Sequence, residues 1–269
     1  MIELIKAIIL GIIQGLTEFL PVSSSGHLVL AQHFMHYQKS DISFEIVLHL
    51  GSLLAVLIFF RKDIIELAVA PFKFSKRDEK NKKDLRSLLY LIIATFITGV
   101  LGYLLKDKFE AMFNRPFLAS LMLVVTGVIL FFSDKISNTN IAMENMGIKK
   151  SIFIGLGQTF AIIPGISRSG TTIAVSIFNG VERADAAKFS FLLSIPAILG
   201  ANISEFSAIV HLDKQNMIQY FSGAVAAFIS GYLVIALLIN IVKKQKLKIF
   251  SIYCWIVAIV SALFLILGY

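Results

Sequence analysis

Long apolar stretches separated by short charged segments dominate the chain. Six of them are apolar along nearly their whole length: 42–60, 87–105, 117–133, 187–208, 217–240 and 249–268. Roughly 20 apolar residues are needed to cross a bilayer core of about 30 Å, so we expect each stretch to be a transmembrane helix. The pattern predicts an all-α polytopic membrane protein with a single integral membrane domain over residues 1–269.

Two further apolar regions, 4–37 and 151–180, are interrupted. Each contains an apolar helix of about a dozen residues, a break rich in Pro, Ser and Gly, and a second short apolar helix. Neither piece is long enough to span a bilayer, so each region predicts a re-entrant helical hairpin. Irregular backbone at membrane depth is tolerated only where it is buried in protein or lines a watery cavity. The hairpins are therefore candidates for the functional site.

The two interrupted regions resemble each other at an offset of 144 positions. The coinciding pairs are Gly11 and Gly155, Gln14 and Gln158, Ser23 and Ser167, Ser25 and Ser169, and Gly26 and Gly170. We therefore predict repeat one over 1–134 and repeat two over 149–269, each with one hairpin and three transmembrane helices. Because three is odd, the second repeat would start on the opposite side, which makes the repeats inverted. The hairpin tips would then meet near the midplane, where inverted-repeat proteins place their sites.

Charge adds an orientation to this topology. The chain is 57% hydrophobic with a net charge of +8, but its lysines lie in short loops, so we expect a lipid bilayer and no nucleic acid as partner. Under the predicted topology eighteen Lys and Arg residues lie on one face and six on the other. The positive-inside rule places the charged loops in the cytoplasm, including 61–86, expected to be a mobile linker, and both termini outside. The first hairpin would enter from the outer face and the second from the cytoplasmic face.

Arg168 is the strongest candidate for binding an anion. It stands in the sequence Pro-Gly-Ile-Ser-Arg-Ser-Gly-Thr-Thr at 164–172, just before an apolar helix. Free N–H groups at that helix start, the guanidinium, and the hydroxyls of Ser167, Ser169 and Thr172 form a set suited to phosphate. The alternative is a structural arginine that bridges helix ends or pairs with Glu18.

Glu18 follows Gln14 by four residues, so both lie on one helical face. The carboxylate suits a hard divalent cation, or a general base, or a structural partner for Arg168. Gln14 suits either a substrate contact or a hydrogen bond between helices.

The serines that follow supply a candidate nucleophile. Ser23, Ser24 and Ser25 precede Gly26 and His27. A serine needs a neighbouring base to become a nucleophile, and His27 is within about one helical turn of Ser24. One of the serines is expected to cap the helix 26–36 and another to face substrate.

Glu45 and His49 are stacked four residues apart inside the next predicted span. They suit either support for the site or hydrogen bonding between helices.

Taken together, the motifs resemble those of the undecaprenyl-diphosphate phosphatases of the bacitracin-resistance family, across the whole chain. The family signatures are a Glu/Gln-x-x-x-Glu stretch leading into Pro-Val-Ser-Ser-x-Gly-His, and Pro-Gly-x-Ser-Arg-Ser-x-x-Thr. Here they stand as Gln14 and Glu18 followed by residues 21–27, and as residues 164–172. Many relatives have Glu where this chain has Gln14, which leaves Glu18 as the expected metal ligand.

The resemblance implies hydrolysis of undecaprenyl diphosphate to the monophosphate and inorganic phosphate with Mg²⁺ or Ca²⁺. This reaction recycles the carrier lipid of peptidoglycan synthesis and confers bacitracin resistance, in the bacterial cell membrane, with the active site opening to the outer face. Glu18, Ser24, His27 and Arg168 would be catalytic. Gln14, Ser23, Ser25, Ser167, Ser169 and Thr172 would bind substrate, with Glu45 as a weaker candidate.

Several alternatives stay open at this point. Either Ser24 attacks phosphorus, with His27 or Glu18 as base, or a metal-activated water attacks while Ser24 positions it. A transporter or flippase of lipid diphosphates would use the same architecture. Acid-phosphatase-like lipid phosphatases need a His six residues after the Arg, where this chain has Ala174. A homodimer is the one protein partner considered.

Overall fold

Helices form nearly all of the regular structure. The computed structural model describes residues 1–269 except 38–41, 74–77, 114, 205–215 and 268–269. In chain order the helices are α1 (Ile2–Phe19), α2 (Ser24–Phe34), α3 (Ile42–Phe59), α4 (Arg61–Val69), η1 (Ala70–Phe72), α5 (Glu79–Leu104), α6 (Lys106–Phe113), α7 (Pro116–Asp134), η2 (Met143–Asn145), α8 (Ile148–Phe160), α9 (Arg168–Phe178), α10 (Arg183–Ser204), α12 (Met217–Lys243) and α13 (Lys248–Ile266). The predicted all-α fold is confirmed.

Five of the helices, α5, α7, α10, α12 and α13, are long and apolar enough to cross a membrane. A sixth crossing is obtained if α3 is joined to α4 and η1, with a bend of 76° between them. These segments correspond to the six predicted spans, although residues 205–208 of the expected 187–208 span and residue 268 of the expected 249–268 span lie outside the described residues. Length and hydropathy thus define a multi-pass membrane protein.

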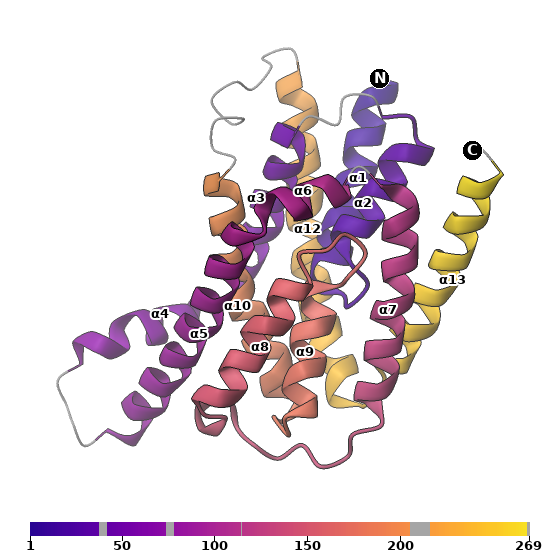
Figure 1. Cartoon of the computed structure of the whole chain (residues 1–269). Coiled ribbons are helices and arrows are strands. Elements are labelled where there is room, and N and C mark those ends of the chain that lie inside the picture. The colour runs from indigo at the N-terminus through magenta and orange to yellow at the C-terminus, as the bar shows by residue number, and fades with distance from the viewer. Residues whose placement is uncertain (38–41, 74–77, 114, 205–215, 268–269) are drawn as a thin grey trace.

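Two broken helix pairs occupy the predicted hairpin regions. The pair α1–α2 runs in from the end of the molecule that carries both termini, and α8–α9 runs in from the opposite end (Figure 1). At 18 residues α1 is longer than the dozen expected, whereas α8 has 13. The two breaks touch, because Ser169 Oγ donates to Leu20 O at 3.0 Å. A Cβ on Gly26 would also lie only 3.0 Å from Gly165 Cα.

Small residues let the long helices approach closely around these pairs. α1 packs along α12, α8 packs along α5, and α7 packs against α13. A Cβ on Gly15 would lie 2.2 Å from Ala227 O of α12, and one on Gly155 would lie 2.8 Å from Ala94 O of α5. Glycine at these positions permits backbone contact between helices, which is how membrane helices gain packing energy without a hydrophobic driving force.

The charged segment 61–86 differs from the mobile linker that we expected. Its described residues form α4, η1 and the start of α5, so the expectation was wrong for them. Leu67 and Ala70 are buried, and two ion pairs accompany the helices: Lys80 Nζ lies 2.6 Å from Glu66 Oε1, and Asp63 pairs with Lys188 of α10. Asp78 caps α5 by accepting a hydrogen bond from Lys80 N at 3.0 Å. The helix α4 has only nine residues of mixed polarity, too few for apolar periodicity to reveal it.

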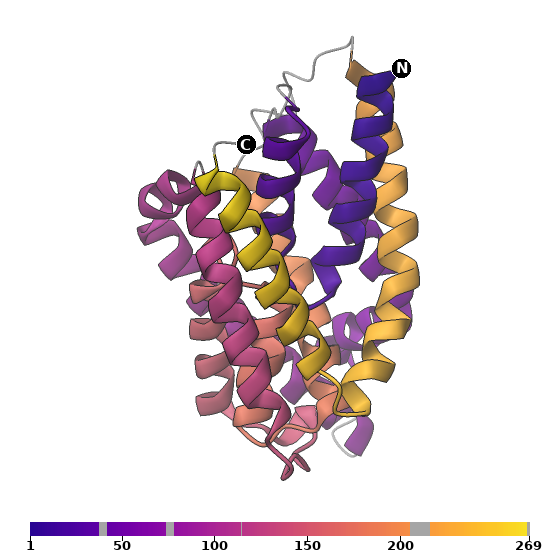
Figure 2. The ribbon, with the colours of Figure 1, turned by 90° about the vertical axis from the view of Figure 1, so that its right-hand side faces the viewer.

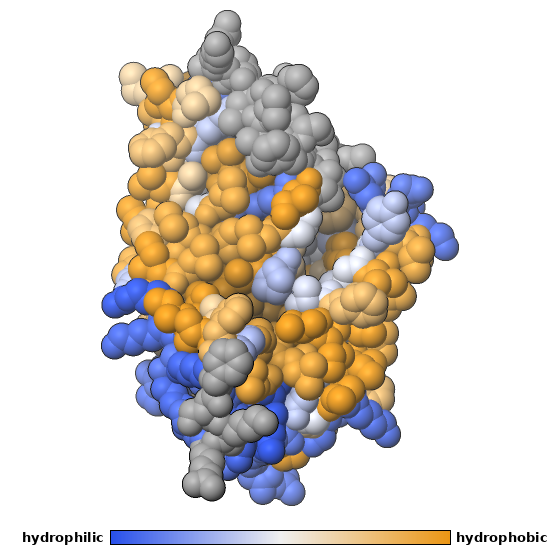
Figure 3. Space-filling view, turned by 90° about the vertical axis from the view of Figure 1, so that its left-hand side faces the viewer, coloured by the Kyte–Doolittle hydropathy of each residue, from blue (hydrophilic) through white to orange (hydrophobic). Residues whose placement is uncertain are grey.

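The two termini lie at the same end of the molecule, opposite the connection from α7 to α8 (Figure 2). An apolar band covers the middle of the face in Figure 3, with hydrophilic residues gathered at its lower end and a smaller group at the upper right.

Candidate active site

Glu18 is the centre of a buried polar cluster where the two breaks meet. It lies in the last turn of α1, and its side chain is 6% exposed. Its Oε2 accepts hydrogen bonds from Ser24 Oγ at 2.5 Å and from Gln14 Nε2 at 3.0 Å. Its Oε1 pairs with Arg168 Nη2 at 3.0 Å. One carboxylate therefore joins both hairpins, and charge-assisted hydrogen bonds of this kind are the strong ones.

Arg168 begins α9 and reaches across to the first hairpin. Besides the Glu18 carboxylate, Nη2 donates to Glu18 O at 3.4 Å, and Nη1 donates to Ser190 O at 3.1 Å. The side chain as a whole is 15% exposed. The pairing with Glu18 that we considered as an alternative is present, and it joins Arg168 to the carboxylate that also binds the Ser24 hydroxyl.

The matched serines make the same local contacts in both hairpins. Ser23 Oγ accepts from Gly26 N at 3.2 Å and caps α2, while Ser167 Oγ accepts from Gly170 N at 3.0 Å and caps α9. Ser25 and Ser169 each lie 3.3 Å from the capping serine of their own hairpin. The prediction that one of the first three serines is an N-cap is confirmed for Ser23.

The residues between the matched serines differ, and they carry the chemistry. Ser24 and Arg168 are 144 positions apart, as the matched pairs are, and both contact Glu18. Matched positions thus present a hydroxyl in one hairpin and a guanidinium in the other, although the capping serines before them differ in backbone, with φ 71° at Ser23 and φ -74° at Ser167.

Three hydroxyls expected in the anion site are engaged inside the protein instead. Ser167 caps α9, Ser169 donates to Leu20 O, and Thr172 Oγ1 donates to Arg168 O at 2.9 Å. All three side chains are buried. These hydrogen bonds stabilise the start of α9, where Arg168 stands.

Gln14 is fully buried, and only the nitrogen of its side-chain amide is hydrogen-bonded. Nε2 donates to Glu18 and lies 3.4 Å from Ser52 Oγ of α3. Its Oε1 has no hydrogen-bond partner within the described part of the chain. A buried acceptor without a donor is costly, so this oxygen is suited to a cation or water.

His27 is turned away from Ser24. Its Nδ1 lies 2.8 Å from Ser23 O, and its Nε2 lies 2.9 Å from Tyr253 Oη. The hydrogen bond between His27 and Ser24 that the spacing allowed is not formed, and the Ser24 hydroxyl donates its hydrogen bond to Glu18. Ser23 itself adopts φ 71°, a left-handed conformation that is strained for a residue with a side chain and is typical of functional sites.

Of the pair in α3, His49 belongs to the cluster and Glu45 does not. His49 Nε2 lies 3.8 Å from Glu18 Oε2, close enough for an ion pair when the ring is protonated. Glu45 Oε1 instead accepts from Gln32 Nε2 at 3.0 Å. Sequence reasoning undervalued His49 because α3 has no break or motif around it.

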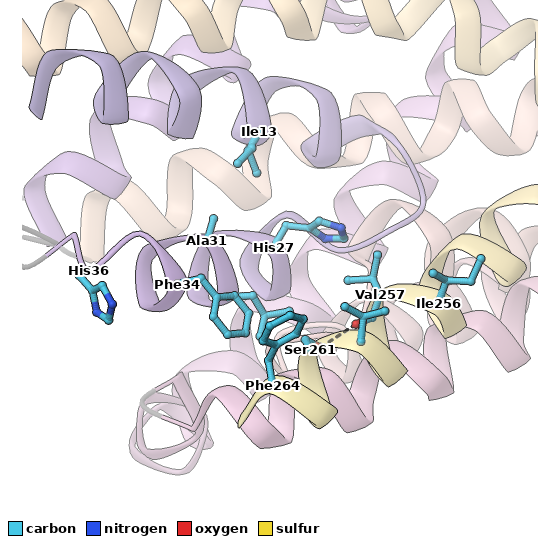
Figure 4. Close-up of a pocket in the computed structure, with 11 residues that line it drawn as sticks. Ile13, His27, Ala31, Phe34, His36, Ile256, Val257, Ser261 and Phe264 are labelled. Atoms are coloured by element: carbon cyan, nitrogen blue, oxygen red, sulfur yellow. Dashed lines mark hydrogen bonds between the residues drawn. The ribbon is translucent and has the colours of Figure 1, made fainter. Parts of the chain in front are cut away.

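A mostly apolar crevice of about 820 Å³ adjoins the cluster at His27. We call it the α2–α13 crevice; its lining residues are Ile13, His27, Leu30, Ala31, Phe34, His36, Ile256, Val257, Val260, Ser261 and Phe264. Figure 4 shows α2 side chains on one wall and α13 side chains on the other. Near its outer end Phe34 and Phe264 touch, with ring centroids 5.9 Å apart. The crevice provides an apolar surface directly beside a polar site.

The fold and the site define a multi-pass helical membrane protein with a buried Glu–Arg–Ser centre built from two broken helix pairs. Residues 7–260 match the family model described as Bacitracin resistance protein BacA. The chain belongs to this family, which confirms the family resemblance seen in the motifs.

Relatives of known name match along almost the whole chain. The Undecaprenyl-diphosphatase of Methanobrevibacter smithii is 45% identical over 268 residues, covering 96% of each chain. Undecaprenyl-diphosphatase 1 of Shouchella clausii is 42% identical, covering 97% of this chain and 96% of the relative. The Undecaprenyl-diphosphatase of Syntrophotalea carbinolica is also 42% identical, over 94% and 95% respectively.

Proposed function

We propose that this protein hydrolyses undecaprenyl diphosphate to undecaprenyl phosphate and inorganic phosphate, and so recycles the carrier lipid for peptidoglycan synthesis and confers bacitracin resistance. The observation that carries the proposal is the Ser24 hydroxyl, held 2.5 Å from a buried carboxylate whose other oxygen pairs with Arg168. This arrangement gives a nucleophile, its base and an anion-binding group within one cluster. The names of the relatives support the same substrate.

In the proposed reaction, Ser24 Oγ attacks the terminal phosphorus and its proton passes to Glu18. The bond from that phosphorus to the bridging oxygen breaks, and the lipid phosphate leaves. Water then attacks the phosphoserine, releases inorganic phosphate and restores Ser24. Phosphoryl transfer depends mostly on positioning and on charge stabilisation, which Arg168 supplies once phosphate competes with Glu18 for its guanidinium. His27 does not serve as the base in this mechanism, because its ring nitrogens are bonded elsewhere.

Mg²⁺ or Ca²⁺ is the cofactor that we propose. Hard cations prefer oxygen ligands, and the site offers Glu18, Ser24 and the unpartnered Gln14 Oε1. The described residues contain no group of three or more His, Cys, Asp and Glu able to hold a metal ion. The protein oxygens thus fit a cation that shares its ligands with the diphosphate. When bound, the cation would neutralise part of the diphosphate charge. Gln14 would then contribute its Oε1 as a second ligand beside Glu18, although a neutral amide is a weaker ligand than a carboxylate.

We place the lipid chain of the substrate in the α2–α13 crevice, whose walls are mostly apolar and which reaches the site at His27. By the positive-inside rule the basic loops face the cytoplasm of a bacterial cell, and the first hairpin opens to the outer face. A homodimer stays a prediction.

Phosphate release from undecaprenyl diphosphate by the purified protein tests the proposal. We expect release that requires Mg²⁺ or Ca²⁺, stops with EDTA, and is lost in Arg168→Ala. Arg61→Ala is the matched control, since this exposed arginine begins α4, donates a hydrogen bond to Ile58 O and is not one of the residues that contact Glu18. A well-folded protein that releases no phosphate would refute the enzyme and favour a lipid-diphosphate transporter.

A further inference from the structure

The contact between His27 and Tyr253 joins the first hairpin to α13, 226 residues further along the chain. His27 Nε2 lies 2.9 Å from Tyr253 Oη. The two rings also stack, with centroids 5.6 Å apart and 5° between their planes. Tyr253 therefore fixes both the plane of the imidazole and the direction of one of its nitrogens.

The second contact of His27 determines its tautomer. Nδ1 lies 2.8 Å from Ser23 O, and a carbonyl oxygen can only accept, so Nδ1 carries the hydrogen. In the neutral ring Nε2 is then an acceptor, and the Tyr253 hydroxyl donates to it. Both nitrogens are thus occupied on the side away from Ser24, whose hydroxyl donates to Glu18.

His27 faces the α2–α13 crevice, which it lines together with apolar residues such as Leu30 and Val257. We propose that Tyr253 is a positioning residue that holds both ring nitrogens of His27 away from Ser24, so that the Ser24 hydroxyl stays bonded to Glu18. This inference rests on the proposed function, because Ser24 is the nucleophile and Glu18 its base in the proposed reaction.

A double-mutant cycle tests whether Tyr253 acts through His27. Tyr253→Phe keeps the stacked ring and removes only the hydroxyl, so we expect kcat/KM to fall about three- to tenfold, the range for one lost hydrogen bond. In a His27→Gln background the same substitution should change kcat/KM less than about twofold. Equal losses in both backgrounds, or no loss with His27 present, would overturn the inference. Tyr232→Phe on α12, whose ring contacts Phe59 and Phe228, is the matched control and should change neither background.

Chemical labelling gives a readout that is independent of turnover. Diethyl pyrocarbonate modifies imidazole nitrogens, and mass spectrometry resolves each histidine. We expect His27 to react about threefold faster or more in Tyr253→Phe, with the exposed His36 unchanged as an internal control. An unchanged rate at His27 would overturn the inference. If the unsubstituted protein released no phosphate, the proposed function would fail, and the labelling would still decide whether Tyr253 holds His27.

Discussion

Glu18 and Arg168 form a buried ion pair, and we expect the loss of one of its charges to destabilise the protein because the other charge is left unpaired. The Arg168 Nη2 and Glu18 Oε1 atoms are 3.0 Å apart, which corresponds to a Coulomb attraction of about 5.5 kcal/mol at an effective dielectric constant of about 20. Desolvation of both groups offsets much of this attraction. Glu18→Gln would leave a desolvated guanidinium without its counter-charge, so we expect the free energy of unfolding to fall by about 3 kcal/mol.

The double substitution Glu18→Gln with Arg168→Gln removes the unpaired charge, so its loss should be smaller than the sum of the single losses by about 2 kcal/mol. Unfolding of the purified protein in detergent can be followed by the fluorescence of Trp255, the one tryptophan of the chain, which packs on Phe131. The exposed pair Glu79 and Lys82 provides the control cycle, and its coupling should be too small to measure. Additive losses at Glu18 and Arg168 would refute the reasoning.

Three further outcomes follow from the site and its supports. Ser24→Ala should lower phosphate release at least about a thousandfold with the fold intact, since it removes the nucleophile; a loss below tenfold would favour attack by water. Gly165→Ala should destabilise the protein by roughly 1–3 kcal/mol, because Gly165 has φ 92° and a Cβ there would lie 2.3 Å from Ala119 O. Gly99→Ala in α5, where a Cβ meets nothing within 4 Å, should instead be neutral or stabilising in the same fluorescence-detected unfolding assay. Calcium or magnesium added with a diphosphate analogue should raise the unfolding temperature more than either alone; additive shifts would contradict a cation that shares its ligands with the substrate.

Much of the architecture could be predicted from the sequence because membrane helices follow simple rules of length and hydropathy. The spans from Ile42, Pro116 and Lys248 begin within one residue of their predicted starts. The two broken helix pairs were predicted because Pro, Ser and Gly interrupt apolar sequence only where protein can satisfy the backbone. The helix α4 was missed because its nine residues mix charged and apolar side chains, and its buried Leu67 is recognised only once the rest of the core is in place.

The site was predictable in its members and less so in its contacts. Glu18, Ser24 and Arg168 were selected by motif, and the structure brings all three together. The direction of His27 was not predictable, because its partner Tyr253 stands in α13 without a motif around it. The sequence spacing allowed a hydrogen bond from His27 to Ser24. In the structure His27 Nε2 contacts the Tyr253 hydroxyl and Ser24 donates to Glu18, so that bond is not formed.

The order in which the chain is synthesised makes the first hairpin the last part to be completed. Arg168 is made 150 residues after Glu18, which at about 5–20 residues per second is a delay of roughly 8–30 s. The α12 helix, along which α1 packs, emerges later still. During this time the newly made α1 has neither Arg168 to pair with its Glu18 carboxylate nor α12 to pack against Gly11 and Gly15. Insertion of α1 and α2 into their final place must therefore follow, and depend on, the synthesis of the second half.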